Sequence, residues 1–365
     1  MSTIKTLTSP VPPGGTVGIL GGGQLGRMLA MAAARLGLRA HVYCDDPGSP
    51  ASQVCDAHTL GKFEDLPAIA IFAAGCDVVT YEFENVPAAS VGHIADIVPA
   101  NPGALALRIT QDRFEEKRFI QSLGLATPRF AKIDSEQEAH VAFADIGGRA
   151  VLKTRRLGYD GKGQAKASSA AEAAAGFESF HRAPSIIEAF IPFEFEASVI
   201  AARGMDGAFA AFDPPENHHA DHILRRSTVP GRLTPAQADA AKAIARRIAE
   251  ALDYVGVLAV ELFVLRDGSL MVNEIAPRVH NSGHWTIEAC AVSQFEQHIR
   301  AVCGWPLGDP ARHADAVMEN IIGAEADAWE SYANRAGALH LYGKGEARPG
   351  RKMGHFTMLA PLTKR

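Results

Sequence analysis

The chain has 365 residues, of which 47% are hydrophobic and 21% charged, and its net charge is −5. This length predicts two or three domains with ample core. The small negative charge offers no general attraction to nucleic acid or to an anionic membrane, so neither is expected as a partner. Five cysteines without CxxC spacing are typical of free thiols in a reducing cytosol. The longest apolar run, residues 68–75, is too short to span a bilayer, so we expect a cytoplasmic protein.

The first part of the chain, residues 1–104, predicts a parallel sheet. Strands are expected at residues 16–20, 38–43 and 77–83. A helix is expected to run from the glycine motif after the first strand to about Leu36, with Gly37 as its stop. A strand–helix–strand start of this kind is typical of α/β proteins.

The motif Gly21-x-Gly23-x-x-Gly26 joins the first strand to the first helix. With Asp45 and Asp46 about twenty residues further on, it matches the dinucleotide-binding fingerprint, which indicates an NAD-dependent oxidoreductase. However, N–H groups at a helix N-terminus bind any phosphate, so a phosphorylated substrate fits equally well. Close packing of the helix on the strand is the third alternative.

The middle of the chain, residues 105–254, is expected to contain both helices and strands. Helices are expected at residues 110–123, 168–180 and 234–252, and strands at residues 150–154, 185–190 and 195–201. The segment holding His218, His219 and His222 is interrupted by prolines, and we expect a loop there. A loop that lines a nucleotide or a substrate is favoured over a zinc site.

A second glycine-rich segment, TRRLGYDGKGQ, follows Lys153 on its predicted strand. Gly158, Gly161 and Gly163 let the backbone approach phosphates, and Lys162 adds positive charge. The segment is not a P-loop, because the spacing differs and no Ser or Thr follows the lysine. Taken alone, it is also compatible with an ordinary surface turn.

Residues 255–276 predict a β-hairpin with a two-residue turn at Asp267-Gly268. This turn places Glu261 opposite Glu274 and puts Asn273 on the other face. Two carboxylates directly opposite each other are destabilising, and a shared Mg²⁺ would remove the repulsion. The alternative is that one glutamate is protonated or points to solvent. The polar residues Arg278, His280, Asn281, Ser282 and His284 follow immediately.

Five motifs in this order resemble those of the N5-carboxyaminoimidazole ribonucleotide synthases: GGGQLGRM, TYEFENVP, GYDGKGQ, NEIAPRVHNSGHWT and RPGRKMGH. The resemblance covers Val17 to His355. It implies an α/β (α+β) protein with the ATP-grasp fold, divided into a Rossmann-like domain (1–104), an ATP-grasp domain (105–304) and a small C-terminal domain (305–365). A homodimer is also implied.

The implied reaction is the ATP-dependent carboxylation of 5-aminoimidazole ribonucleotide with bicarbonate, in purine biosynthesis. Its products are N5-carboxyaminoimidazole ribonucleotide, ADP and phosphate, its intermediate is carboxyphosphate, and its cofactors are ATP and Mg²⁺. Because carboxyphosphate is hydrolytically fragile, the GYDGKGQ loop is expected to close as a lid. The NAD-dependent oxidoreductase remains the alternative, but it leaves the two facing glutamates unexplained. A catalytically silent nucleotide-binding protein is a second rival.

Carried onto this sequence, the resemblance also implies sites. ATP phosphates fall to Arg108, Lys153, Gly158, Tyr159, Asp160, Gly161, Lys162, Gly163 and Gln164. The rest of the nucleotide falls to Glu188, Ala189, Phe190 and Ile191 at the adenine, Glu196 at the ribose and His219 nearby. Mg²⁺ falls to Glu261 and Glu274, with Asn273 beside them. The ribonucleotide falls to Gln24, Glu82, Asn281, Ser282, Arg351 and Lys352. Bicarbonate is surrounded by Tyr159, Arg278 and His280, which with Lys153 form the catalytic set. The chain departs from the expected pattern at Glu216, where a histidine is expected.

Overall fold

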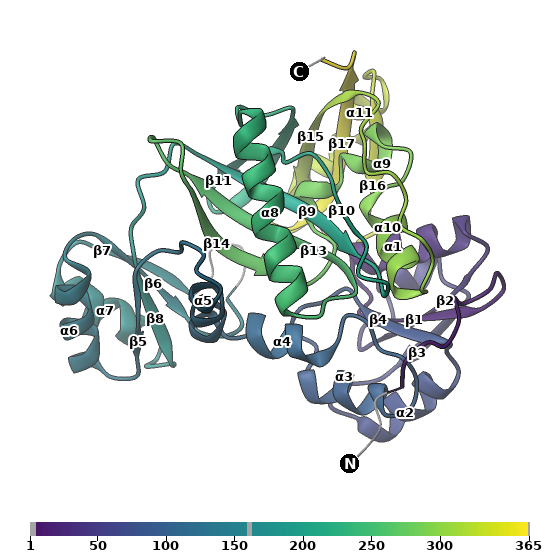
Figure 1. Cartoon of the computed structure of the whole chain (residues 1–365), viewed down its shortest axis with the longest axis horizontal. Helices are drawn as coiled ribbons and strands as arrows, with labels where there is room; N and C mark the ends of the chain where they lie inside the picture. The colour runs from purple at the N-terminus through teal and green to yellow at the C-terminus, as the bar shows by residue number, and fades with distance from the viewer. Residues whose placement is uncertain (1–4, 159–162, 364–365) are drawn as a thin grey trace.

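The computed structural model describes residues 5–158 and 163–363. Its first unit is a four-stranded parallel sheet in the order β3-β2-β1-β4 (Figure 1). The strands are β1 (Thr16–Leu20), β2 (Arg39–Cys44), β3 (Ala57–Leu60) and β4 (Val78–Tyr81), and the helices of this unit are α1 (Gln24–Arg35), α2 (Leu66–Ala74) and α3 (Ala88–Ala95). The three predicted strands and the helix are confirmed, and Gly37 ends the helix with φ at +73°. Strand β3 was not predicted.

A small antiparallel sheet in the order β5-β8-β6-β7 forms the second unit. Its strands are β5 (Phe130–Ile133), β6 (Ala150–Thr154), β7 (Gln164–Ala167) and β8 (Ser185–Ala189). Helices α6 (Glu136–Ile146) and α7 (Ala170–Ser179) contribute to the same hydrophobic core as this sheet, and Figure 1 shows them at its outer side.

The third sheet has nine strands in the order β14-β13-β9-β11-β12-β15-β17-β16, with β10 beside β9. The strands are β9 (Phe195–Arg203), β10 (Phe209–Ala211), β11 (Glu216–Ala220), β12 (Ile223–Val229), β13 (Gly256–Val264), β14 (Leu270–Ala276), β15 (Asp315–Ile322), β16 (Ala338–Leu341) and β17 (Lys352–Ala360). The C-terminal strands therefore extend the sheet that carries the predicted metal ligands.

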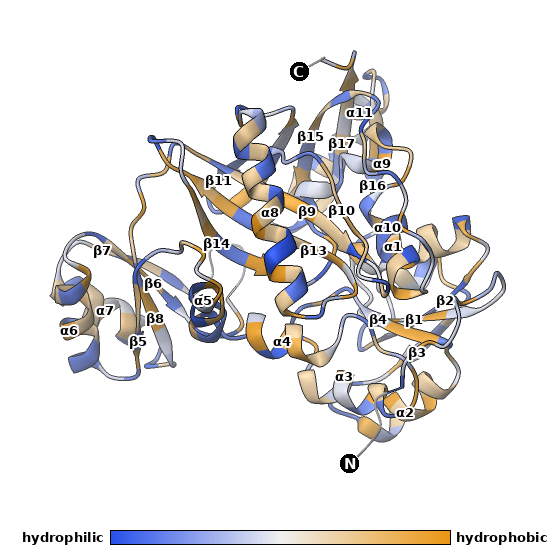
Figure 2. Ribbon diagram, in the orientation of Figure 1, coloured by the Kyte–Doolittle hydropathy of each residue, from blue (hydrophilic) through white to orange (hydrophobic). Residues whose placement is uncertain are grey.

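Two helices cover opposite faces of strands β9 and β13. Helix α8 (Pro235–Ala251), which opens with the predicted capping box, packs on Val199 and Val260. Helix α10 (Gln294–Val302) packs on Ile200 and Ala259 and shares that core with α1. Figure 2 shows apolar residues along β13 and along β1 and β4. One continuous core thus joins the first sheet to the largest.

The remaining helices are short: α4 (Ala104–Thr110), α5 (Arg113–Ser122), α9 (Thr286–Ala289), α11 (Trp329–Ala333), η1 (Ala51–Gln53), η2 (Asn281–Gly283) and η3 (Gly323–Ala328). The helix predicted at residues 110–123 is confirmed as α5, but it begins three residues later than predicted, because Asp112 accepts hydrogen bonds from the N–H groups of Phe114 and Glu115 and so caps its N-terminus. The loop predicted around His219 is a hairpin of β11 and β12.

All five cysteines are free thiols, as predicted. In the part of the chain that the structure describes, no helix is both long and apolar enough to cross a membrane.

His298 on α10 ties the first sheet to the largest. Its Nε2 lies 2.7 Å from the Thr80 hydroxyl on β4, and its Nδ1 accepts a hydrogen bond from the Val257 N–H on β13. Burial lowers the pKa of this imidazole from 6.5 to about 3. The neutral ring is therefore the form that the fold requires.

We predict that His298 makes the fold sensitive to acid. Because the folded-state pKa is lowered, its contribution is complete above pH 6.5 and is lost as the pH falls toward 3, since the unfolded chain takes up the proton first. His298→Gln should be less stable than the wild type at pH 8, and the gap should shrink by up to roughly 1.4 kcal/mol per pH unit below 6.5. Urea unfolding of both proteins between pH 4.5 and 8 measures this. A gap that stays constant with pH would contradict it.

Candidate active site

Glu261 on β13 and Glu274 on β14 are paired, as predicted, although the turn differs. The Leu265 N–H donates to the Ser269 carbonyl, so the loop has three residues and ends with Gly268 at a φ of +83°. This shifts the pairing by one residue. A β-bulge at Asn273 then shifts it back, because Leu262 pairs with Val272 and Glu261 with Glu274. The two shifts cancel.

The bulge also changes where Asn273 lies. Val272 and Ile275 both belong to the core with α8, which strict alternation along β14 would forbid. The extra residue between them is Asn273, so the alternation that predicted it on the face opposite Glu274 does not hold. Its side-chain Oδ1 is buried and has no hydrogen-bond partner in the described residues.

Each of the facing glutamates has a basic side chain as partner. Glu261 lies 3.2 Å from His280 Nε2, and Glu274 lies 2.9 Å from Arg113 Nη1. Burial acts to raise the pKa of Glu261, but the hydrogen bond and charge of His280, followed by His219 and Lys352, hold it at about 2. The contacts with His280 and Arg113 therefore offset part of the repulsion, and the choice between a shared cation and a protonated or solvent-facing glutamate stays a prediction.

The donor set nevertheless fits a hard divalent cation. The carboxylates of Glu261 and Glu274 are paired across the hairpin, and the orphaned Asn273 oxygen belongs to the residue beside Glu274. Oxygen donors of this kind are the ligands that Mg²⁺ takes together with phosphates.

Buried charges connect the small sheet to this hairpin. Lys153 on β6 donates to Glu188 Oε2 on β8 at 3.0 Å, and Lys117 on α5 lies 3.5 Å from the same oxygen. All three side chains are buried. Although burial acts to raise the pKa of Glu188, the charges of Lys117 and Lys153 hold it at about 2. The two lysines therefore occupy the Glu188 carboxylate. Ala189, Phe190 and Ile191 follow directly in the chain.

The glycine motif holds a carboxylate. Glu82, which follows β4, accepts hydrogen bonds from the N–H groups of Gly23 at 2.7 Å and Gly26 at 3.2 Å. A Cβ at Gly21, whose φ is +113°, would lie 2.6 Å from the Glu82 side chain. A buried carboxylate of the chain itself therefore takes the Gly23 and Gly26 amides, which the sequence had suggested for a phosphate.

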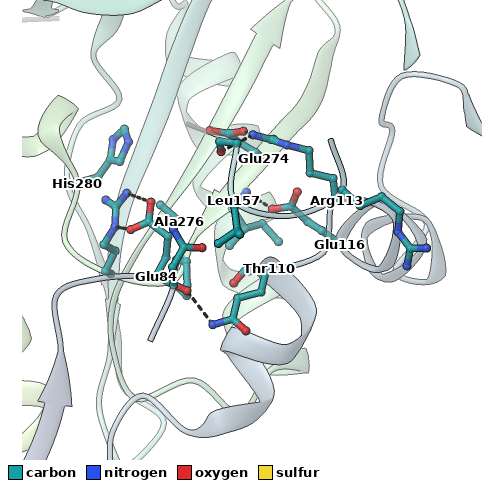
Figure 3. A pocket seen from close by; sticks show the side chains of 15 residues that line it. Glu84, Thr110, Arg113, Glu116, Leu157, Glu274, Ala276 and His280 are labelled. Atoms are coloured by element: carbon teal, nitrogen blue, oxygen red, sulfur yellow. Dashed lines mark hydrogen bonds and ion pairs between the residues drawn. The ribbon is translucent and has the colours of Figure 1, made fainter. Parts of the chain in front are cut away.

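A pocket opens where the first unit meets the hairpin (Figure 3). Arg278 donates to Glu84 of the TYEFENVP motif at 2.5 and 2.7 Å, and His280 lies beside them. Arg113 also donates to the Gly158 carbonyl at 3.0 Å. The other lining residues are Asn85, Thr110, Gln111, Glu116, Arg155, Leu157, Glu274, Ile275, Ala276 and Pro277. Arg108, predicted for the phosphates, is exposed on α4 and does not line this pocket. Tyr159, Asp160, Gly161 and Lys162 lie outside the described residues.

Asn281 and Ser282 have their polar groups engaged inside the protein. Asn281 exchanges two amide hydrogen bonds with Asn320, at 2.9 and 2.7 Å. Ser282 is fully buried and lies 2.9 Å from His280 Nδ1 and 2.7 Å from the Ser198 hydroxyl. The prediction that Ser282 contacts substrate does not fit this burial, since its hydroxyl orients His280 instead.

Other predicted residues border the same region. Glu196 Oε2 lies 2.7 Å from His219 Nδ1. Lys352 begins β17, and its charge contributes to the low pKa of Glu261. Gln53 of the first unit donates to the Gly343 carbonyl at 2.8 Å, so the segment before β17 touches that unit. The remaining predicted positions, which are partly buried, are Gln24, Gly163, Gln164 and Arg351.

Family models and known proteins match this chain over nearly its whole length. Residues 15–111 match the ribonucleotide synthetase preATP-grasp domain, 118–295 the ATP-grasp domain and 316–364 the phosphoribosylaminoimidazole carboxylase C-terminal domain. The N5-carboxyaminoimidazole ribonucleotide synthase of Brucella melitensis is 51% identical over 96% of this chain and 98% of its own length. The chain belongs to the N5-carboxyaminoimidazole ribonucleotide synthase family.

Solved structures agree with this assignment. An ADP complex of an N5-carboxyaminoimidazole ribonucleotide synthetase matches with a TM-score of 0.94 and 41% identity, covering 97% of this chain and 94% of the other. The Aspergillus clavatus synthase in complex with ADP and 5-aminoimidazole ribonucleotide matches with a TM-score of 0.90 and 33% identity, covering 96% and 94%. The ATP-grasp fold and an ATP-dependent ligase function are thereby confirmed, and the oxidoreductase alternative is wrong.

Sequence reasoning missed the charged face of α5. Arg113, Glu116 and Lys117 all contact β14. Their spacing of i, i+3 and i+4 after the N-cap Asp112 places them on one helix face, and this was the signal that could have revealed them. Glu84, which holds Arg278, was also missed although it lies within a recognised motif.

Proposed function

We propose that this synthase performs its carboxylation at the pocket between the first unit, helix α5 and the β13–β14 hairpin. The observation that carries the proposal is that Glu84, Glu274, Arg278 and His280, from two separate family motifs, line one pocket. Bicarbonate would attack the γ-phosphorus of ATP and release ADP, and the exocyclic amine of the ribonucleotide would then attack the carboxyl carbon and release phosphate. Excluding water protects the carboxyphosphate.

ATP would lie between the small sheet and the largest sheet. Lys153 and the residue 158–164 loop would contact its phosphates, and the backbone of residues 188–191 its adenine. Glu196, which is in contact with His219, would accept a hydrogen bond from a ribose hydroxyl. Glu261, Asn273 and Glu274 would hold Mg²⁺, which neutralises phosphate charge when bound. The buried Lys153 ammonium adds a fixed positive charge in a site from which water is largely removed.

Arg278 and His280 would orient bicarbonate. Glu84 accepts two hydrogen bonds from the Arg278 guanidinium, so the arginine is already positioned before any substrate binds. Ser282 and Glu261 fix the two ring nitrogens of His280 in the same way. Prepositioned groups of this kind lower the barrier because they need no reorganisation during reaction.

The ribonucleotide would lie between the first unit and β17. Glu82 suits its neutral ribose hydroxyls and repels its phosphate, so the phosphate is assigned to Arg351 and Lys352, with Gln24 nearby. The contact of Gln53 with Gly343 supports this placement, because it brings the C-terminal segment against the glycine motif's unit.

We also propose a cytoplasmic homodimer with domains at 1–104, 105–304 and 305–365. The five free thiols suit a reducing compartment. Sedimentation equilibrium should give twice the chain mass of 38.8 kDa. A single 38.8 kDa species at micromolar concentration would contradict the dimer.

We predict that Glu274→Gln abolishes turnover. The change removes a metal ligand charge, so ADP and phosphate release should fall by about 10²-fold or more. Coupled assays in saturating Mg²⁺ measure this, and circular dichroism checks the fold. Glu115→Gln, an exposed carboxylate on the same helix as Arg113, is the matched control. Near-normal phosphate release by the Glu274 variant would rule out its role.

We predict that Lys352→Ala weakens the ribonucleotide selectively. A lost charge-assisted hydrogen bond costs about 1.5–3 kcal/mol, so the KM for 5-aminoimidazole ribonucleotide should rise roughly tenfold or more. The KM for ATP should barely change. Steady-state kinetics with each substrate varied separately test this, with the exposed Lys166→Ala as control. A shift in the ATP constant alone would mean that the two phosphate sites are exchanged.

A further inference from the structure

Strand β14 is the edge of the largest sheet, and it carries the bulge. An edge strand has a row of backbone groups without strand partners, and a bulge disrupts the ladder further. Here those groups are met from outside the sheet. The Val272 N–H donates to the Ala126 carbonyl at 2.8 Å, and its carbonyl accepts from the Thr127 hydroxyl at 3.1 Å.

The two groups flanking Glu274 are met by charged side chains of α5. The Lys117 ammonium donates to the Asn273 carbonyl at 2.5 Å. Glu116 Oε1 accepts the Ile275 N–H at 2.7 Å. Arg113, on the same helix face, pairs with the Glu274 side chain itself. One turn of α5 therefore contacts three consecutive residues of β14.

Lys117 also reaches the other sheet, because its ammonium lies 3.5 Å from Glu188 Oε2 on β8. Both Lys117 and Glu116 are at most 2% exposed. Burying such charges is costly unless their partners are well placed, and apolar residues would fill the same space at less cost. Burial acts to raise the pKa of Glu116, and the charge of Glu274 adds to this effect. Stability alone does not account for two adjacent buried ionisable groups here.

We propose that Lys117 and Glu116 are positioning residues that hold the bulge at Asn273 and so aim Asn273 and Glu274 at the nucleotide's metal. This rests on the proposed role of these two residues as Mg²⁺ ligands. Lys117 is 1% exposed, so it acts through β14 rather than on a substrate. Because its ammonium also contacts Glu188, Lys117 fixes β14 relative to β8, the strand that leads into the proposed adenine-binding residues 188–191.

The test is metal affinity. Mn²⁺ binding in the presence of ADP, followed by electron paramagnetic resonance, reports the ligands without requiring turnover. Supporting residues of this kind typically change metal affinity 10–100-fold. Lys117→Met should therefore weaken Mn²⁺ about tenfold or more and raise the Mg²⁺ concentration for half-maximal activity similarly. Lys132→Met, which removes an exposed lysine on β5, should change neither.

Glu116 supplies a rescue test. Glu116→Gln keeps an oxygen that accepts the Ile275 N–H, so its Mn²⁺ affinity should stay within about threefold of the wild type. Glu116→Leu removes the acceptor and should match Lys117→Met, with faster amide hydrogen exchange in residues 270–278. If the Gln and Leu variants behave alike, the proposal is overturned. This pair decides the matter even if Lys117→Met fails to fold.

A double-mutant cycle with Glu274→Gln separates this proposal from the proposed function. Lys117→Met should cost much less Mn²⁺ affinity when Glu274 is already glutamine. Equal losses in both backgrounds would show that Lys117 acts elsewhere and would overturn the inference. If Glu274→Gln leaves Mn²⁺ affinity unchanged, the metal assignment fails. If Glu274→Gln weakens binding and Lys117→Met does not, only the present proposal fails.

Discussion

The extra residue at Asn273 determines how the charged side of the largest sheet is arranged. A three-residue turn alone would have moved every later residue of β14 by one position, and Glu274 would have faced the core. The bulge restores Glu274 opposite Glu261 while keeping Val272 and Ile275 in the core. Core packing and the donor set can both be satisfied only with one residue out of the ladder.

Charge compensation follows from this geometry. The two carboxylates held on one face have basic partners, and these come from different parts of the chain: His280 after β14 and Arg113 on α5. Lys117, Glu188 and Lys153 form a second group, in which one carboxylate serves two ammonium groups. In a buried setting such pairs are coupled, so a change in any one of them affects the others. The contacts between the small sheet, α5 and β14 thereby consist of mutually dependent ionisable groups.

The glycine motif shows how one local structure serves different chemistry. Glycines are required at Gly21 and Gly23 because the backbone approaches another group closely. In a dinucleotide-binding protein that group is a pyrophosphate. Here it is the carboxylate of Glu82, which arrives from the end of β4. The group that the glycine motif binds is thus a side chain of the protein itself.

The sequence by itself determined the parallel first sheet, the strand bearing Lys153 and the capping box of α8. These depend on periodicity, turn residues and caps, which act over a few residues. Family motifs added the reaction and the position of Arg278. Only the tertiary structure decided that Glu82 fills the glycine loop, that Ser282 supports His280, and that Arg113 rather than Arg108 lines the pocket. It also decided the Asn273 bulge, and with it the pairing of Glu261 with Glu274, because partners more than 150 residues away in the chain, Glu116 and Lys117, meet the backbone groups of β14 beside the bulge. Local patterns contain no information on such distant contacts, since these arise only when separate elements pack together.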